Sequence, residues 1–107
     1  MLICPFFYNV LSNFLLNAFK HGLATKMVIQ IDGKERKVRV RDNGKGIPVD
    51  VLPNIFKFRF TTGDKNNRGV GLAFVKLISD ASNIQVNAIS KQGEGSFTEF
   101  VLDFSKH

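Results

Sequence analysis

A polar stripe near the start of the chain combines amide and basic side chains at helical spacing. Asn9, Asn13 and Asn17 recur every four residues, and Lys20 and His21 fall on the same side of a helical wheel. Mg²⁺ prefers oxygen ligands and keeps several waters, so one amide oxygen of the stripe could hold a hydrated ion and the phosphates that it bridges. Asparagine on a helix is more often a surface residue, so a solvated helix face remains the alternative.

A second candidate segment, residues 42–48, follows a run with strand character. It places Asp42 ahead of Gly44 and Gly46, with Ile47 and a proline behind them. A carboxylate accepts hydrogen bonds from amino groups, and glycine lets the backbone come close to a ligand. The same residue types are ordinary turn chemistry after a strand, so the segment alone does not decide between a turn and a binding loop.

Two further segments could serve a bound ligand. The first runs from Phe56 to Thr62 and is rich in phenylalanine, which by default predicts a core strand or a loop anchor. The second, residues 68–72, opens a helical pattern with two glycines. Exposed backbone N–H groups and the helix dipole could face an anion there, although glycine before a helix is as often a simple cap.

The elements that position these segments follow from periodicity and from breaker residues. Helices end at glycine and strands alternate apolar with polar residues, while Asp32 and Gly33 form a strong tight-hairpin signal. We expect the first helix to bury Leu11, Phe14, Leu15 and Ala18, the second Leu72, Val75 and Ile78, and the strands Val38, Val40, Phe100, Leu102 and Phe104. The expected helices are 5–21, a short segment at 49–54, and 69–81, and the expected strands are 24–31, 36–41, 84–89 and 96–104.

This order predicts an α+β two-layer sandwich in which antiparallel strands carry helices on one face. At 107 residues the chain is one domain, 1–107. Its single cysteine cannot form an internal disulfide, so we expect a reducing cytoplasmic setting. The net charge of +6 suits an anionic partner, or else reflects a solvated basic surface. The uncharged opening is not a membrane span, because the asparagine stripe makes it amphipathic.

Taken together, the four segments resemble the N, G1, F and G2 boxes of the ATP-binding domain of sensor histidine kinases. This domain belongs to the GHKL superfamily, with gyrase, Hsp90 and MutL, and the resemblance covers nearly the whole chain. It implies a Bergerat-type two-layer α/β sandwich with an antiparallel or mixed sheet. A further strand usually precedes the first helix in that family. We therefore expect this chain to lack that edge strand, the dimerisation and phosphoacceptor domain, and the sensor region.

The resemblance also implies roles for individual residues, with ATP and Mg²⁺ as cofactors. Asn17 matches the Mg²⁺-binding asparagine, Asn13 an accessory asparagine and Lys20 a phosphate contact, while Asp42 matches the acceptor of the adenine amino group. Two positions depart from the family pattern: Arg59 stands where a second aromatic is usual, and Asn67 where a further glycine is usual. The remaining nucleotide-binding positions that it implies are His21, Gly44, Gly46, Ile47, Phe56, Thr61, Thr62, Arg68, Gly69, Val70, Gly71 and Leu72.

Asn13 distinguishes branches of this superfamily, since related ATPases carry a glutamate there that activates water. An amide cannot act as a general base. The resemblance thus implies an ATP-dependent protein-histidine kinase domain that transfers the γ-phosphate to a histidine on a separate domain, and a response regulator downstream. His21 and His107 do not fit as that histidine, so the chain alone is not expected to autophosphorylate. The parent protein could be membrane-anchored.

Two alternatives remain from the sequence. One is a non-catalytic nucleotide-binding or protein-interaction module of the same fold, which predicts weak or Mg²⁺-independent nucleotide binding. The other is a nucleic-acid binder that uses the basic hairpin at residues 34–41, which predicts steep salt dependence. We expect no nucleic-acid partner.

Overall fold

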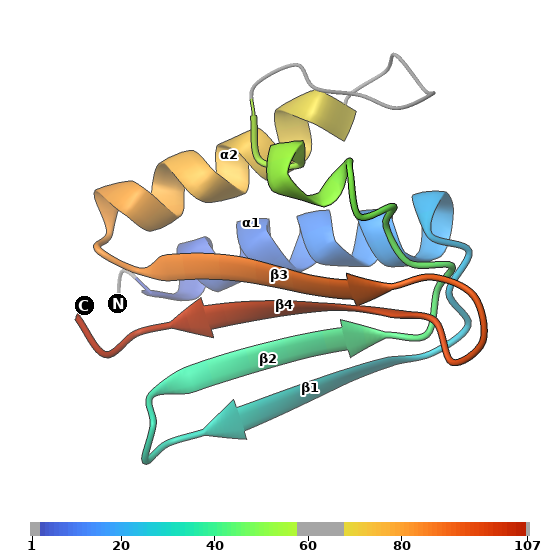
Figure 1. Ribbon diagram of the computed structural model, residues 1–107. Helices are drawn as coiled ribbons and strands as arrows, with labels where there is room; N and C mark the ends of the chain where they lie inside the picture. The colour runs from blue at the N-terminus through green and yellow to red at the C-terminus, as the bar shows by residue number, and fades with distance from the viewer. Residues whose placement is uncertain (1–2, 58–67, 107) are drawn as a thin grey trace.

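The computed structural model describes residues 3–57 and 68–106, without the side chains of residues 3–7, 21 and 68–71 (Figure 1). Two long helices and four strands make up most of it. Their bounds are α1 Ile3–Leu16, η1 Asn17–His21, β1 Met27–Asp32, β2 Lys37–Asp42, η2 Leu52–Asn54, α2 Arg68–Ala81, β3 Gln85–Lys91 and β4 Phe97–Asp103.

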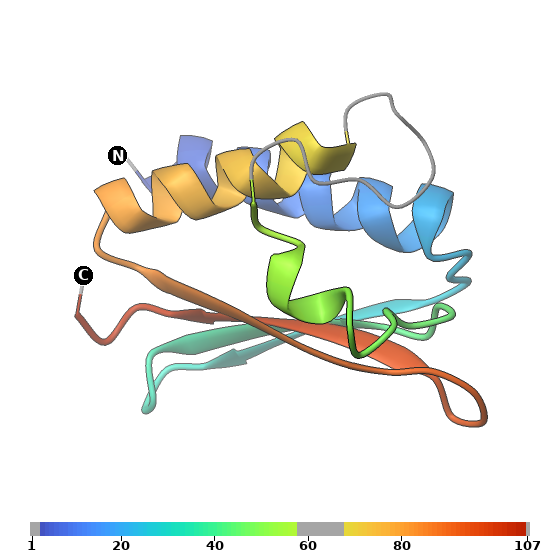
Figure 2. The ribbon, with the colours of Figure 1, turned by 45° about the horizontal axis from the view of Figure 1, so that its top comes forward.

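The four strands form one antiparallel sheet in the order β1-β2-β4-β3. Both helices lie on the same face of this sheet, as two views of the ribbon show (Figures 1 and 2). The predicted α+β two-layer sandwich is therefore confirmed, and within the described residues the sheet is wholly antiparallel.

The core lies between the sheet and the helices. Val38 of β2 is opposite Leu102 of β4, and Val40 is opposite Phe100, so the period-two pattern of both strands places these side chains on one buried face. Phe14 of α1 stacks on Phe100, with ring centroids 4.2 Å apart. Aromatic pairs of this kind add about 0.5–1.5 kcal/mol beyond the area that they bury. The predicted inner face of the sheet is thus confirmed, with Phe104 only partly buried.

The first helix departs from the prediction of a regular helix over residues 5–21. Its last turn widens into the π-helical segment η1, in which Gly22 N–H donates to Asn17 O at 2.7 Å. Leu15, expected in the core, is 46% exposed, because Val10, Phe14 and Ala18 face the sheet and Leu15 falls on the flank of the helix.

The first hairpin also differs from its prediction. Instead of a two-residue turn at Asp32 and Gly33, a four-residue loop over 33–36 joins β1 to β2. Asp32 Oδ1 accepts hydrogen bonds from the backbone N–H groups of Lys34 and Glu35. Arg36 takes the left-handed conformation, with φ of 59°. The carboxylate therefore organises a longer turn, and β2 begins at Lys37, one residue later than predicted.

The other elements agree with the prediction to within a few residues. α2 starts one residue earlier than predicted and buries Leu72 and Val75, with Ile78 partly buried. The short segment predicted at 49–54 shrinks to the 3-10 helix η2. Of the helices in the described part of the chain, none combines the length and the apolar character that crossing a lipid bilayer requires.

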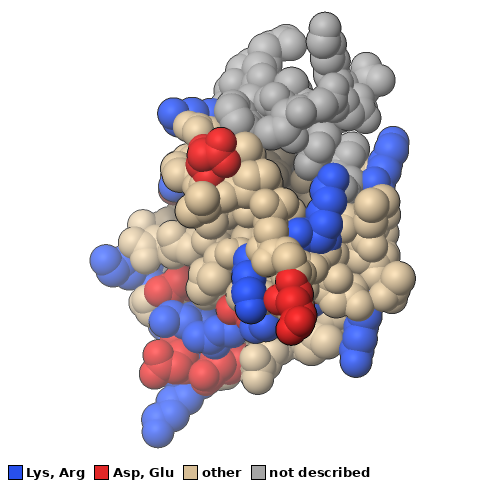
Figure 3. Space-filling model, turned by 45° about the vertical axis from the view of Figure 1, so that its right-hand side comes forward, with Lys and Arg blue, Asp and Glu red and all other residues tan. Residues whose placement is uncertain are grey.

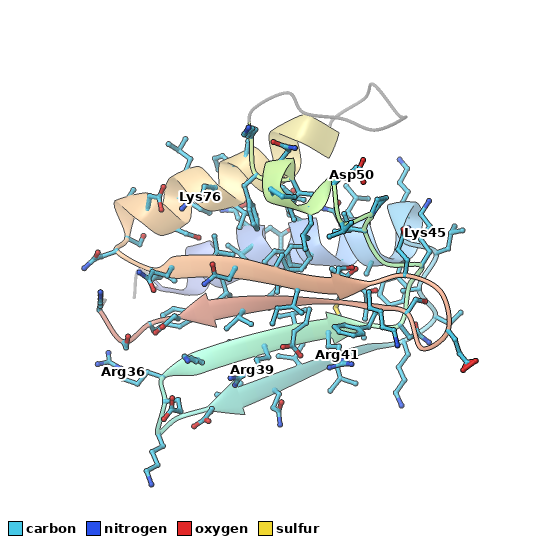
Figure 4. The ribbon with its side chains drawn as sticks, in the orientation of Figure 1. Arg36, Arg39, Arg41, Lys45, Asp50 and Lys76 are labelled. Atoms are coloured by element: carbon cyan, nitrogen blue, oxygen red, sulfur yellow. The ribbon has the colours of Figure 1, made fainter. Side chains whose placement is uncertain are left out.

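The outer face of the sheet carries Arg39 and Arg41, as predicted (Figure 4), and the acidic residue Glu99 of β4 lies close to both. Arg39 Nε is 4.0 Å from Glu99 Oε2, and Arg41 Nη1 is 3.6 Å from Glu99 Oε1. The Arg41 guanidinium also lies 3.8 Å from the centroid of the Phe97 ring. In the space-filling view, acidic and basic side chains lie next to one another over the lower part of the molecule (Figure 3). These contacts weigh against a nucleic-acid surface here.

Candidate functional site

The asparagine stripe of α1 is held by hydrogen bonds from side chain to backbone one turn apart. Asn13 Nδ2 donates to Asn9 O at 2.9 Å, and Asn17 Nδ2 donates to Asn13 O at 2.8 Å. Because each NH₂ group is turned back onto the helix, each Oδ1 oxygen points away from it. An oriented amide oxygen is a ligand type that Mg²⁺ accepts.

The turn that carries Asn17 is the π-helical segment η1, which also holds Lys20, whose side chain is exposed, and the backbone of His21. π-Helical turns are rare in proteins, and those that occur are often found at functional sites. The wider turn lets Asn17 O accept from Gly22 N–H, and Ala18 O accept from Ala24 N–H at 2.8 Å. The chain therefore leaves the helix in a fixed direction, and the Gly22 carbonyl faces the loop that follows β2.

Asp42 is the last residue of β2 and is 6% exposed, on the helix-covered face of the sheet. Its Oδ1 atom accepts a hydrogen bond from Gly44 N–H at 2.7 Å. Burial raises the pKa of the Asp42 carboxyl, and the Gly44 hydrogen bond partly opposes this rise. A carboxylate in such surroundings gains from a further hydrogen-bond donor, because burial has removed part of its hydration.

The two glycines of the loop, Gly44 and Gly46, are required for different structural reasons. At Gly44 a Cβ atom would lie 2.6 Å from Gly22 O, so only glycine lets the loop dock against the end of the first helix. Gly22 O also accepts from Lys45 N–H at 2.8 Å. At Gly46, φ is +78° and a Cβ atom would lie 2.1 Å from Lys91 O. The loop is therefore pressed between η1 on one side and the end of β3 on the other.

Asn43 fastens the same loop to the segment that precedes β1, a role that the sequence analysis missed. Its Oδ1 accepts from the backbone N–H groups of Thr25 and Lys26, both at 2.9 Å, and its Nδ2 donates to Thr25 Oγ1. These bonds explain why β1 begins at Met27 rather than at the predicted residue 24. An asparagine after a strand signals a local turn, and nothing in the sequence pattern indicates a contact 18 residues away.

Two serines near the β3–β4 hairpin hold the far end of the loop, and they too were missed. Ser90 Oγ accepts from Ile47 N–H at 2.8 Å and donates to Phe97 O at 2.8 Å. Thr98 Oγ1 lies 2.9 Å from Ser90 Oγ, and since the serine proton is already used, Thr98 is the donor. Ser96 Oγ donates to Gly44 O at 2.6 Å.

We expect Ser90→Ala to lower the free energy of unfolding by about 1–2 kcal/mol, because the Ile47 N–H and Phe97 C=O groups lose their partner. Urea unfolding monitored by circular dichroism measures the change. Ser12→Ala is the matched control, since the exposed Ser12 hydroxyl only donates back to Tyr8 O within α1. Equal effects of the two substitutions would contradict a structural role for Ser90.

The remaining sequence-predicted residues divide into three groups. Ile47 and Phe56 pack against the core, where Phe56 meets Phe100 edge-on at 6.2 Å, and Leu72 is buried within it. Arg68, Gly69, Val70 and Gly71 form the first turn of α2 as backbone. Thr61 and Thr62, together with Arg59 and Asn67, lie outside the described residues, as do the side chains of His21 and Arg68. The structure thus brings Asn17, Asp42, Gly44 and Gly46 together around Gly22 and the adjoining end of the sheet.

Residues 5–106 match the family model described as "Histidine kinase-, DNA gyrase B-, and HSP90-like ATPase". The chain belongs to this family. Its fold agrees with the expectation from the four boxes, and sensor histidine kinases recur among its relatives.

Three curated relatives illustrate the similarity. The chain is 35% identical over 100 residues to the CAI-1 autoinducer sensor kinase/phosphatase CqsS of Vibrio cholerae, covering 91% of this chain and 14% of that protein. It is 36% identical to the sensor protein KdpD of Clostridium acetobutylicum, covering 86% of this chain and 11% of that protein. It is also 36% identical to the sensor histidine kinase ZraS of Escherichia coli, over 82% and 19% respectively. The chain therefore spans less than a fifth of the length of these relatives.

Two solved structures show the same architecture. The full-length ShkA structure in complex with AMPPNP superposes with a TM-score of 0.72 and 29% identity, covering 88% of this chain and 20% of that one. The mycobacterial sensor histidine kinase MprB gives a TM-score of 0.73 over 88% of this chain and 68% of that one. At 18% identity the second likeness concerns the fold alone.

Proposed function

We propose that this chain binds Mg²⁺-ATP where η1 meets the Asp42–Ile47 loop, and presents the γ-phosphate for transfer to a histidine on a separate domain of a sensor histidine kinase. Family membership and the sensor-kinase relatives support this proposal. The observation that carries it is the contact of Gly44 with Gly22, which brings the asparagine turn next to the buried Asp42 carboxylate.

The base end of the proposed site is the Asp42 carboxylate. One of its oxygens accepts a hydrogen bond from Gly44 N–H, and the other would accept one from the exocyclic amino group of adenine. The oxygen that guanine carries at the equivalent position would be repelled by a carboxylate. Asn43, Ser90 and Ser96 hold the loop from outside, so that Asp42 is positioned before the nucleotide arrives.

The phosphate end of the proposed site is the asparagine stripe. Asn17 Oδ1 would hold the Mg²⁺ ion, with Asn13 as its neighbour one turn earlier, and the geometry of both amides fits an oxygen ligand. When bound, the ion supplies positive charge to the phosphates. Lys20 on η1 and Lys45 of the adjoining loop (Figure 4), whose N–H donates to Gly22 O, add further positive potential at this end of the molecule.

The residues at this end position the phosphates and neutralise their charge, and Asn13 does not act as a general base. An amide does not take a proton from water at neutral pH, so Asn13 cannot activate water for hydrolysis as a carboxylate would. Bound ATP is therefore kept for an incoming nucleophile. Phosphoryl transfer of this kind relies mostly on orientation and electrostatics. We propose that the nucleophile is a histidine of the parent kinase's dimerisation domain, and that a response regulator accepts the phosphoryl group afterwards.

Calorimetric titration with ATP, ADP and GTP, in Mg²⁺ and then in EDTA, tests this function. We expect adenine-selective binding that weakens on chelation. Asn17→Ala should lower the affinity for ATP in Mg²⁺ by about tenfold, to the level that EDTA produces, because the amide acts only through the ion. In EDTA the variant and the wild type should bind alike.

Asn87→Ala is the matched control, since Asn87 is an exposed asparagine of β3, at a sheet position away from the stripe. It should bind as the wild type does in both conditions. Folded protein that binds neither ATP nor ADP would contradict the proposal and favour an interaction module of the same fold. Nucleotide binding that depends neither on Mg²⁺ nor on Asn17 would contradict the metal role of Asn17. It would not contradict the proposed adenine site at Asp42.

A further inference from the structure

A row of polar side chains ends the apolar inner face of the sheet. The register of β2 and β4 places Asp42 opposite Thr98, and the register of β3 and β4 places Thr98 opposite Ser90. These side chains therefore lie next to one another across adjacent strands, on the helix-covered face. The next row on that face is apolar at the same strands, with Val40 opposite Phe100. The polar row thus adjoins the core at the end of the sheet where the loop after β2 begins.

Thr98 is a buried polar residue on a face that is otherwise mostly apolar. Among the side chains that the structure describes, the buried polar or charged ones are Asp42, Ser79 and Thr98, and two of these are neighbours in the row. A buried polar group costs free energy unless it is paired. Adjacent polar side chains beside an apolar surface are typical of a small-molecule site, where a few polar groups fix the orientation of the ligand.

The hydroxyl proton of Thr98 is already used. Ser90 Oγ donates its own proton to Phe97 O and accepts from Ile47 N–H, both at 2.8 Å. Thr98 Oγ1 lies 2.9 Å from Ser90 Oγ and therefore donates to it. Toward a further group, Thr98 Oγ1 can only accept a hydrogen bond. The ionised carboxylate of Asp42 is also only an acceptor, so these two neighbours in the row both require a donor.

The spacing of these two acceptors fits an amino group. Phe104 N–H donates to Arg36 O, so the hydrogen-bonded pairs of β2 and β4 include Asp42 and Thr98. In such opposite pairs the Cβ atoms are about 4.5–5.5 Å apart. A planar amino group points its two N–H bonds about 120° apart, so acceptors at about 3 Å from its nitrogen lie about 5 Å from each other. The row can therefore receive both N–H groups of one amino nitrogen.

We propose that Thr98 is a second specificity-determining residue of the adenine site, where it accepts one N–H of the exocyclic amino group while Asp42 accepts the other. This inference rests on the proposed function, because it places the base at Asp42. The oxygen that guanine carries at the equivalent position would face two acceptors instead of one. A purine that lacks a group there would leave both acceptors without a partner. The pair therefore selects for the amino group itself, in addition to the purine ring.

A nucleotide analogue separates this contact from a structural role. Purine ribonucleoside triphosphate has the ring system, ribose and phosphates of ATP but lacks the exocyclic amino group. Calorimetric titration with both nucleotides in saturating Mg²⁺ measures the preference for ATP. In Thr98→Val we expect the affinity for ATP to fall about five- to tenfold, because one acceptor is lost, while the affinity for the analogue does not fall.

The loop should stay in place in this variant. Valine has nearly the shape of threonine, and Ser90 Oγ keeps its bonds to Ile47 N–H and Phe97 O. Thr98→Ser is the matched control, since it retains the hydroxyl and should bind both nucleotides within about twofold of the wild type. Thr98→Ala is a second variant without a hydroxyl and should show the same loss of preference for ATP. Circular dichroism verifies that each variant is folded.

Two results would overturn this inference. An equal fall in affinity for ATP and for the analogue would mean that Thr98 acts only on the fold, and unchanged ATP affinity in Thr98→Val would mean that it does not contact the base. With either result the proposed function stands if Asp42→Asn still weakens ATP binding. Folded wild-type protein that binds neither nucleotide would overturn both the proposed function and the role of Thr98.

Discussion

Gly46→Ala should lower the free energy of unfolding by about 2–4 kcal/mol, a large share of the 5–15 kcal/mol typical of a domain of this size. The new Cβ atom would lie 2.1 Å from Lys91 O and 2.7 Å from Lys91 C. Both are backbone atoms of β3, so no flexible side chain can move aside. The loop can accept alanine only by lifting away from β3, which breaks the Ile47–Ser90 hydrogen bond and displaces Asp42.

Gly93→Ala separates this steric effect from the cost of the backbone conformation. Gly93 has φ of +84°, close to that of Gly46, but no atom lies within 4 Å of the position that its Cβ would take. Alanine there should cost only about 1 kcal/mol, the penalty of the left-handed region. Urea unfolding of both variants gives the difference. Similar losses of unfolding free energy at the two glycines would show that the loop accommodates the extra methyl group easily. That result would contradict the close docking of the loop that positions Asp42.

Nucleotide titration extends the comparison from stability to function. If Gly46 positions the adenine site, the folded fraction of Gly46→Ala should bind ATP at least about tenfold more weakly, while Gly93→Ala binds normally. Gly93 is exposed in the β3–β4 turn, and alanine there keeps the carbonyl that accepts from Ser96 N–H, so the bond from Ser96 Oγ to Gly44 O stays in place. A Gly46→Ala protein that is destabilised yet binds ATP with full affinity would separate the fold's need for glycine from the site's.

The parts of this molecule that the sequence predicts well are those governed by short periods. The alternation of Val38 and Val40 placed β2 in the sheet with the correct face inward, and the spacing of Leu72 and Val75 did the same for α2. Asp42 could be singled out because a carboxylate followed by glycines after a strand is a local pattern. These features depend on neighbours in the chain, so a single sequence contains them.

The parts that it misses depend on contacts between distant segments. Ser90 and Ser96 are ordinary polar residues of a hairpin, and only the fold brings them to Ile47 N–H and Gly44 O. Leu15 was assigned to the core because it lies opposite the asparagine stripe on a helical wheel, yet it is exposed on the flank of α1. Ile29 and Ile31 are likewise exposed, because the described helices do not cover the inner face of β1. Periodicity indicates which face of an element is apolar, and it does not indicate how far the opposing layer extends.

Asp42→Asn should affect stability and affinity in opposite directions. Burial raises the pKa of Asp42, so the folded state holds its proton more tightly than the unfolded chain does. The stability that protonation confers is fully present below the unfolded pKa of about 3.9 and is lost as pH rises through the folded value. At neutral pH the ionised carboxylate therefore lowers stability. The neutral amide of asparagine keeps an oxygen that can accept a hydrogen bond from Gly44 N–H. It also avoids the free-energy cost of burying a charge.

We therefore expect the ligand-free variant to be more stable than the wild type at pH 7.5, with the difference shrinking toward pH 4. Asp50→Asn is the control, because Asp50 is exposed and its substitution should leave stability unchanged at both pH values (Figure 4). Urea unfolding at the two pH values measures these differences. A variant that is less stable at pH 7.5 would contradict the assignment of a desolvated carboxylate.

ATP affinity should fall about 5- to 150-fold in the same variant, corresponding to the roughly 1–3 kcal/mol of a lost buried hydrogen-bond partner. Preference for ATP over GTP should fall with it, since the new NH₂ group can donate to the guanine oxygen that a carboxylate repels. Calorimetry with both nucleotides measures the two effects on one protein. A gain in stability together with a loss of adenine selectivity is what a residue kept for binding, at a cost to the fold, should show. Unchanged selectivity would place the base elsewhere.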